Sequence, residues 1–195
     1  MRPYRSSQLS SRLSRLSISL VFPLLCLGTP AMAEIINVTS NGFQVRHEVQ
    51  LNIPPEEAYE LLVNVSSWWN PSHTYTLNTK NLSIDARPGG CFCEKYPHGG
   101  GVQHMSVVHA APGKALRMTG ALGPLQAHGL AGSMGWDFIA QKPADNNQAL
   151  SKLVLTYSVG GYMPGGFEKM APMVNAMLAE QITRYKNLAN TGKVD

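Results

Sequence analysis

The chain has 195 residues, with 16 lysines and arginines, 12 aspartates and glutamates, and a formal net charge of +4. Four arginines but no acidic residue lie in residues 1–33, so residues 34–195 carry 12 basic and 12 acidic side chains. That balance leaves no basic stripe for a phosphate backbone, and we expect no nucleic-acid partner. Only two cysteines, Cys91 and Cys93, follow residue 33, which excludes a disulfide-rich scaffold.

Residues 1–33 have the pattern of a secretory signal peptide. A basic start is followed by an apolar run at 18–28 and by small residues at Ala31 and Ala33. The apolar run is too short to cross a bilayer as a helix. We therefore expect cleavage after Ala33, one domain over residues 34–195, and export to the periplasm or the medium. No later stretch is apolar enough to act as a stable membrane anchor.

The first part of the exported chain predicts one strand and one short helix. Residues 42–53 alternate apolar and polar side chains, which is typical of a half-buried antiparallel strand. Two prolines open the segment 54–65, and Glu56 and Glu57 follow in its first turn. This arrangement favours a short helix with acidic residues at its positive end.

The middle of the chain, residues 66–162, predicts an antiparallel meander. Short apolar segments alternate with turns such as Asn70-Pro71 and Pro112-Gly113. The Gly-rich segment 123–132 interrupts them and is expected to be an irregular loop. It is either an ordinary surface loop or a cover for a binding site.

The C-terminal part changes to helical periodicity. Apolar residues recur every three or four positions, which predicts an amphipathic helix over residues 165–190, with Gly192 just beyond its end. One face carries Met170, Met173 and Met177, and methionine adapts to irregular surroundings. That face is either ordinary core or the wall of a cavity.

Together these elements predict an α+β fold. We expect a curved antiparallel sheet of six to seven strands, two short helices after the first strand, and a long C-terminal helix lying across the sheet. A single helix does not fill a wide curved surface. A cavity between helix and sheet is therefore expected.

Several segments carry a family resemblance. They are "IPPEEAYELL", "SSWWNPSHTY", "ARPGGCFCE", "VVHAAPGKALRMTGALGPLQ" and "LVLTYSVGGY", followed by the closing helix. With them, residues 42–188 resemble the START-like helix-grip superfamily, also called SRPBCC. That group includes polyketide cyclases and activators of a chaperone ATPase. The resemblance implies a deep apolar cavity for a hydrophobic or amphipathic small molecule. We expect no cofactor. The expected export departs from the chaperone-activator pattern.

The segment 89–104, "GGCFCEKYPHGGGVQH", leaves several possibilities open. In one hairpin register Cys91, Cys93 and His104 share a face and could bind zinc. In the register shifted by one residue, Glu94 faces His104 and could orient its imidazole as a general base. A disulfide between Cys91 and Cys93 is disfavoured on an extended strand, where the two Cβ atoms are too far apart. Two reduced thiols packed as small apolar groups are the preferred reading.

The expected function is that of an exported protein that binds a hydrophobic small molecule. The residues expected to bind it are Trp69, Tyr157, Met170 and Met177, with Glu94 and His104 as a polar pair. The alternatives are a cyclase- or hydratase-like enzyme with His104 as base, a metal-binding domain, and a protein-interaction module. No nucleophile elbow, dinucleotide-binding fingerprint or phosphate-binding loop occurs in the sequence.

Overall fold

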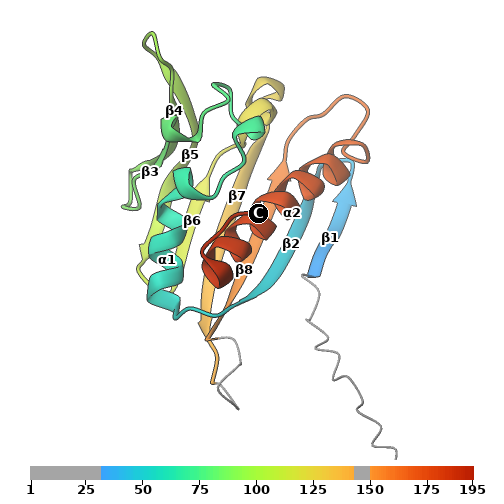
Figure 1. Ribbon diagram of the computed structural model, residues 1–195. Helices are drawn as coiled ribbons and strands as arrows, with labels where there is room; N and C mark the ends of the chain where they lie inside the picture. Colours follow the sequence, from blue (N-terminus) through green and yellow to red (C-terminus); the bar gives the residue numbers. More distant parts are fainter. Residues whose placement is uncertain (1–31, 143–149) are drawn as a thin grey trace, which may run out of the picture.

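The described part of the chain, residues 32–142 and 150–195 of a computed structural model, contains eight strands in one antiparallel sheet (Figure 1). The strand order is β1-β2-β8-β7-β6-β5-β4-β3, so the first two strands lie at one edge and β3 at the other. The strands are β1 (Met32–Thr39), β2 (Gly42–Leu51), β3 (Leu82–Ile84), β4 (Cys91–Lys95), β5 (Gly101–Ala111), β6 (Ala115–Thr119), β7 (Ala131–Ala140) and β8 (Ser151–Gly160).

Two α-helices cover one face of this sheet, α1 (Pro55–Val63) and α2 (Met170–Thr191). Helix α2 packs against β1 and β2, whereas α1 contacts β7 and β8. Four 3-10 segments complete the fold: η1 (Val65–Ser67), η2 (Pro71–His73), η3 (Thr79–Asn81) and η4 (Gly123–His128). None of the helices in the described residues could cross a membrane.

The α+β fold class and the long closing helix are confirmed. The alternation predicted for 42–53 is also found in β2, where Phe43, Val45, His47, Val49 and Leu51 are buried. Helix α2 ends at Gly192 as predicted, because the left-handed conformation of this residue (φ 75°) terminates the hydrogen-bond pattern.

Three details differ from the prediction. Helix α2 starts at Met170 rather than near 165, because Gly165 and Gly166 both have positive φ. The second short helix is absent from residues 64–81, which form only the single turns η1, η2 and η3. An extra edge strand, β1, pairs with β2, and its first two residues fall within the expected signal peptide. The rest of that peptide lies outside the described residues.

The space beneath the middle of α2 is filled by side chains. Trp68, Trp136 and Tyr185 are buried there, with Trp68 at ring-centroid distances of 6.2 Å from Trp136 and 5.4 Å from Tyr185. The Tyr185 hydroxyl donates to the Ala58 carbonyl at 2.6 Å and so joins α2 to α1. The predicted hollow is therefore not under the centre of the helix.

We expect Leu178→Ala to destabilise the fold by about 2–5 kcal/mol, because Leu178 is fully buried in the core beneath α2. Met173→Ala on the same helix is the matched control, since Met173 is 59% exposed and its replacement should change stability by less than about 0.5 kcal/mol. Urea denaturation of both variants checks this prediction. Equal effects of the two substitutions would contradict the packing described here.

Candidate functional site

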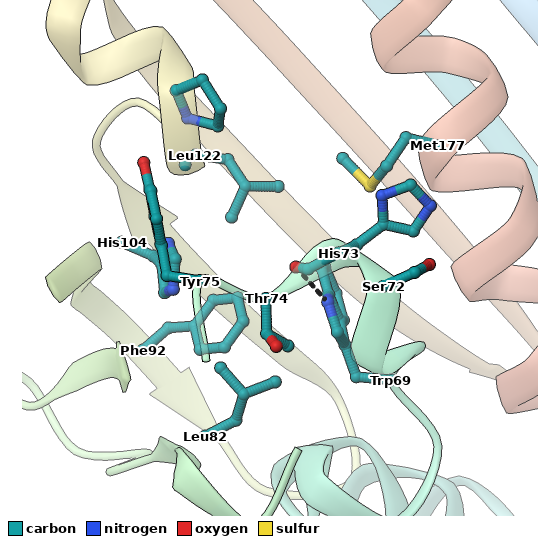
Figure 2. Close-up of a pocket in the computed structure, with 12 residues that line it drawn as sticks. Trp69, Ser72, His73, Thr74, Tyr75, Leu82, Phe92, His104, Leu122 and Met177 are labelled. Carbon is teal, nitrogen blue, oxygen red and sulfur yellow. Dashed lines mark hydrogen bonds between the residues drawn. The ribbon is translucent and has the colours of Figure 1, made fainter. Parts of the chain in front are cut away.

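A cavity of about 290 Å³ lies toward the β3 edge of the sheet (Figure 2). Its walls come from the sheet, from the chain after α1, from η4 and from one side chain of α2. The lining residues are Trp69, Ser72, His73, Thr74, Tyr75, Leu82, Phe92, His104, Leu122, Gly123, Pro124 and Met177. The set is mainly apolar and aromatic with a few polar groups, which is the usual composition of a small-molecule site.

The chain from residue 64 to 81, here called the strap, forms one wall of the cavity. Polar side chains of α2 hold it in place. Arg184 donates to the carbonyl of Trp68 at 3.0 Å, and the Gln181 side chain accepts from the backbone N–H of Asn70 at 2.8 Å. Glu180 accepts from the Asn70 amide and contacts His73 Nε2 at 2.8 Å. The position of the strap therefore depends on α2.

The adjacent tryptophans of the strap have different environments. Trp68 belongs to the core under α2, where its indole N–H donates to the Leu61 carbonyl at 3.0 Å. Trp69 lines the cavity instead, packs against Phe92 at 5.4 Å, and donates to the His73 carbonyl at 3.1 Å. The two indole rings also contact each other, with centroids 5.4 Å apart, so Trp69 joins the cavity wall to the core.

A bulge in the hairpin β4–β5 decides how Glu94 and His104 meet. Phe92 pairs with Met105, but the next residue, Cys93, pairs with Gln103, so His104 has no partner in the ladder. Neither hairpin register considered from the sequence is therefore correct. An extra residue on one strand re-aims its side chain, and here it turns the His104 ring toward Glu94 and Phe92.

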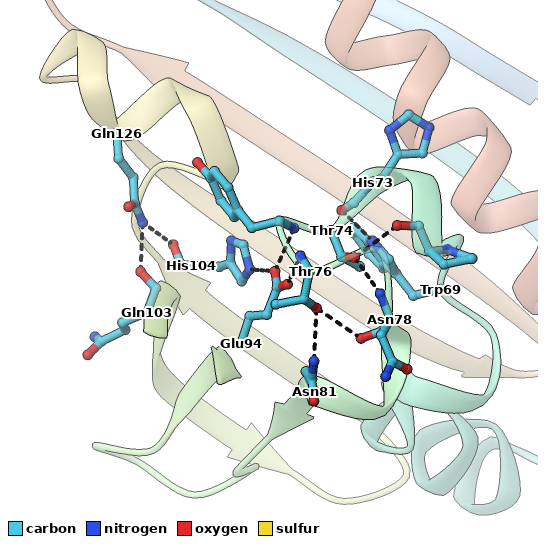
Figure 3. Close-up of polar contacts among 12 residues, drawn as sticks. Trp69, His73, Thr74, Thr76, Asn78, Asn81, Glu94, Gln103, His104 and Gln126 are labelled. Atoms are coloured by element: carbon cyan, nitrogen blue, oxygen red, sulfur yellow. Dashed lines mark hydrogen bonds and ion pairs between the residues drawn. The ribbon is translucent and has the colours of Figure 1, made fainter. Parts of the chain in front are cut away.

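Glu94 is a buried carboxylate held by the strap (Figure 3). Its two oxygens accept the backbone N–H groups of Tyr75, at 3.1 Å, and Thr76, at 2.7 Å. Burial by itself raises the pKa of Glu94, but the hydrogen bonds from Thr76, Tyr75 and His104 outweigh it and leave the pKa below its ordinary value. Glu94 is therefore ionised at neutral pH.

The hydrogen bond to Glu94 determines which ring nitrogen of His104 carries the hydrogen. Nε2 of His104 lies 3.4 Å from Oε2 of Glu94, at the long end of hydrogen bonding, and an ionised carboxylate can only accept. Burial lowers the pKa of His104, and Glu94 opposes this shift only in part. The imidazole is thus neutral with its hydrogen on Nε2. Its other nitrogen, Nδ1, is buried and has no hydrogen-bond partner among the described residues.

Tyr75 covers the His104 ring from the solvent side. The two rings are stacked, with centroids 6.1 Å apart and planes inclined by 19°. Tyr75 is 52% exposed, and it also contacts Tyr96 of the hairpin. The same residue that donates its backbone N–H to Glu94 therefore shields the imidazole with its side chain.

The preferred reading of Cys91 and Cys93 as reduced thiols is not what the structure shows, because the two residues form a disulfide. Their Cα atoms are 5.5 Å apart, which is shorter than the roughly 6.6 Å of an extended pair and normal for a disulfide. The bulge in the β4–β5 ladder accompanies this contraction of β4.

The alternative zinc set of Cys91, Cys93 and His104 is also not assembled. The cysteines alternate with the buried Phe92 and Glu94 and so lie on the outer face of the sheet, opposite His104. Among the described residues, no three His, Cys, Asp or Glu side chains are grouped in a way that could hold a metal ion.

The structure brings together some of the predicted site residues. Trp69, His104 and Met177 line the cavity, and Glu94 lies directly behind His104. Tyr157 and Met170 do not line it, contrary to expectation. Tyr157 is fully buried, burial raises its pKa to about 12, and its hydroxyl accepts the backbone N–H of Leu122 at 2.9 Å. It therefore supports the segment that leads into η4.

Two contacts of the site were not predicted from the sequence. The N–H groups of Tyr75 and Thr76 are backbone groups, which every residue except proline has, so no residue pattern could mark them. Gln126 of η4 donates to the carbonyls of Gln103 and His104, at 2.6 and 3.3 Å, and so joins η4 to the bulge. No sequence motif marks this contact either, because the two segments meet only in the folded chain.

No family model and no curated protein matches this chain. Solved structures do match its fold. A conserved protein of unknown function from Enterococcus faecalis matches with a TM-score of 0.56 and 15% identity over 83% of this chain and 78% of its own. CalU16 from Micromonospora echinospora matches with a TM-score of 0.52 and 10% identity over 81% and 83% of the two chains.

A third match is the di-domain ARO/CYC protein StfQ from the steffimycin biosynthetic pathway, with a TM-score of 0.51 and 14% identity. The match covers 77% of this chain and 52% of that protein. These similarities confirm the helix-grip fold expected from the sequence resemblance. At such low identity they describe the fold alone.

The free energy of unfolding should fall as the pH drops below about 6.5. Burial lowers the pKa values of His104 and of the buried His47 below 6.5. Below about pH 6.5 the unfolded chain therefore binds more protons than the folded chain. This loss continues until the pH reaches the lower folded pKa values, and protonation of Glu94 adds to it in more acidic solution. Urea denaturation between pH 7.5 and 5 measures the slope.

In His104→Phe the slope should be shallower than in the wild type, with the contribution of His47 remaining. His109→Phe is the matched control, because His109 is exposed on the same strand. A wild-type slope in the His104 variant would show that His104 is not the group that resists protonation.

Proposed function

We propose that this protein binds a small hydrophobic or amphipathic molecule in the cavity beneath the strap. The observation that carries this proposal is the apolar cavity, in whose wall His104 lies. Nδ1 of His104 is buried and has no hydrogen-bond partner among the described residues. An unsatisfied buried polar group costs about 1–3 kcal/mol, and a ligand that donates a hydrogen bond to it recovers this energy. The apolar walls supply the remaining affinity by burial.

The size and composition of the cavity support such a ligand. At about 290 Å³ it is near the lower end of small-molecule pockets, which range over about 300–1,000 Å³. Trp69 and Phe92 offer aromatic surfaces, and Leu82, Leu122 and Met177 offer aliphatic ones. A compound of one or two rings fits these dimensions better than a long lipid chain.

Binding of the two-ring compound 1-naphthylamine, followed by its fluorescence, tests the proposal. We expect saturable binding to the wild type and at least about tenfold weaker binding to Met177→Trp, whose larger side chain fills the cavity. Met173→Trp is the control one helical turn away, and it should bind like the wild type because residue 173 is exposed. Equal affinities of the two variants would place the binding site elsewhere.

A second candidate function is general-base catalysis by His104, favoured by its contact with Glu94. A neutral imidazole whose Nε2–H is held by a carboxylate can remove a proton at Nδ1, and the carboxylate then stabilises the imidazolium. The cyclase- or hydratase-like reaction expected as an alternative would use this step on a carbonyl compound. The lowered pKa of His104 keeps the base form populated at neutral pH.

Exchange of the α-hydrogens of 2-tetralone in D₂O, followed by proton NMR, tests the second candidate. If His104 is a base, the wild type should accelerate exchange above the buffer rate by about 10²-fold or more. His104→Phe should lose the acceleration while still binding the ketone. Exchange at the buffer rate with the wild type, under conditions where 2-tetralone is bound, would reject this role.

Export is the remaining part of the proposal. The signal-like pattern of residues 1–33 supports it, as does the Cys91–Cys93 disulfide, because disulfides persist mainly in oxidising compartments. Mass spectrometry of the protein purified from its own host should give a chain that begins at Glu34. A cytosolic chain that retains residues 1–33 would contradict export.

A further inference from the structure

The first inference rests on the proposed function and concerns the class of ligand. Nδ1 of His104 can only accept a hydrogen bond, because the single proton of the neutral ring is on Nε2 and is directed at Glu94. A ligand that satisfies Nδ1 must therefore carry an O–H or N–H group. A ketone, ether or carboxylate oxygen directed at Nδ1 would bring two hydrogen-bond acceptors together, and no hydrogen bond would form.

The negative charge of Glu94, behind the His104 imidazole, also restricts the class of ligand. The Glu94 carboxylate is buried 3.4 Å behind His104, and no lysine or arginine is among the residues that line the cavity. The one other ionisable imidazole on the wall, His73, is engaged with Glu180 at 2.8 Å. In a partly buried site an anion close to this carboxylate is repelled more strongly than it would be in water.

We infer that the cavity selects a neutral compound of one or two rings that presents an O–H or N–H donor to His104, and that it rejects a carboxylate of the same shape. The aromatic walls determine the shape of the ligand, and the unpaired nitrogen of His104 requires a donor. The negative charge of Glu94, with no lysine or arginine in the cavity wall, excludes an anion. Long-chain fatty acids and other anionic lipids are therefore outside the expected class of ligands.

Three naphthalenes of similar shape separate these requirements: 2-naphthol, which is neutral with a donor; 2-methoxynaphthalene, which is neutral without one; and 2-naphthoate, which is an anion. Their dissociation constants are measured by equilibrium dialysis at pH 7.5. We expect 2-naphthol to bind best, with 2-methoxynaphthalene about fivefold weaker and 2-naphthoate more than about tenfold weaker. Binding of 2-naphthoate as tight as that of 2-naphthol would overturn the inference.

His104→Phe should abolish the preference for 2-naphthol over 2-methoxynaphthalene, whereas His109→Phe should preserve it. Circular dichroism verifies that both variants are folded, and the comparison of the three compounds on the wild type needs no variant at all. Persistence of the preference in His104→Phe would overturn the assignment of the acceptor. If none of the three compounds binds the wild type, the proposed function itself fails.

A second, independent observation concerns the disulfide. Cys91 and Cys93 flank Phe92, whose ring lines the cavity at centroid distances of 5.0 Å from His104 and 5.4 Å from Trp69. The bond holds this part of β4 in its contracted form, where the register with β5 changes. Both cysteines are partly exposed on the outer face, so a reductant in solution can reach them.

We propose that the redox state of Cys91 and Cys93 controls the affinity of the cavity. A dithiol reductant breaks the S–S bond, transfers two electrons and two protons to give two thiols, and becomes a disulfide itself. After reduction, β4 extends toward the Cα spacing of an ordinary strand. This extension removes the bulge that turns His104 toward Glu94. Phe92 and His104 then lose the arrangement that the ligand contacts.

The dissociation constant of 2-naphthol is measured before and after treatment with dithiothreitol. Reduction should weaken binding roughly three- to tenfold, and the double variant Cys91→Ser, Cys93→Ser should bind like the reduced protein whether or not dithiothreitol is present. Equal affinities before and after reduction would overturn this proposal. So would alkylation of two free thiols in untreated protein, whereas failure of the oxidised protein to bind 2-naphthol counts against the proposed function instead.

Discussion

The buried carboxylate of Glu94 is the constraint on which the candidate site depends. An ionised carboxylate is retained in a protein interior only where hydrogen-bond donors surround it. Here two donors are backbone N–H groups of the strap and the third is the imidazole of His104. One side chain thus attaches the strap to the sheet and determines which nitrogen of His104 is free.

Helix α2 completes this arrangement from the other side. Glu180, Gln181 and Arg184 hold residues 68–73 of the strap through hydrogen bonds, and Met177 one turn earlier forms part of the cavity wall. The middle of the helix packs tightly on the core, so the described residues leave no large hollow beneath this part of it. The cavity instead occupies the region where the strap, η4 and the narrow end of the sheet do not fill the space between them.

The fold could largely be predicted because its signals are local. The period-two pattern of residues 42–51 and the helical period of residues 170–191 each follow from one face being apolar, and that requirement holds in any α+β arrangement. The edge strand β1 was missed because residues 34–39, which make up most of it, have no buried side chain and so lack the clear alternation of a half-buried strand. The start of α2 was placed too early because Gly165 and Gly166 were taken as the opening of the helix, whereas their positive φ keeps them outside it.

The sequence by itself determined that Glu94, His104 and two cysteines lie in one hairpin, and that a tryptophan and a methionine far from them are available as apolar walls. Only the tertiary structure decided which of these side chains share a face. A single bulged residue changes the side of the sheet on which every following side chain lies. Whether the bulge forms depends on contacts of the hairpin with the strap and η4, which sequence spacing does not encode. For the same reason the partner of Glu94 is a pair of backbone N–H groups that only the folded strap brings within reach.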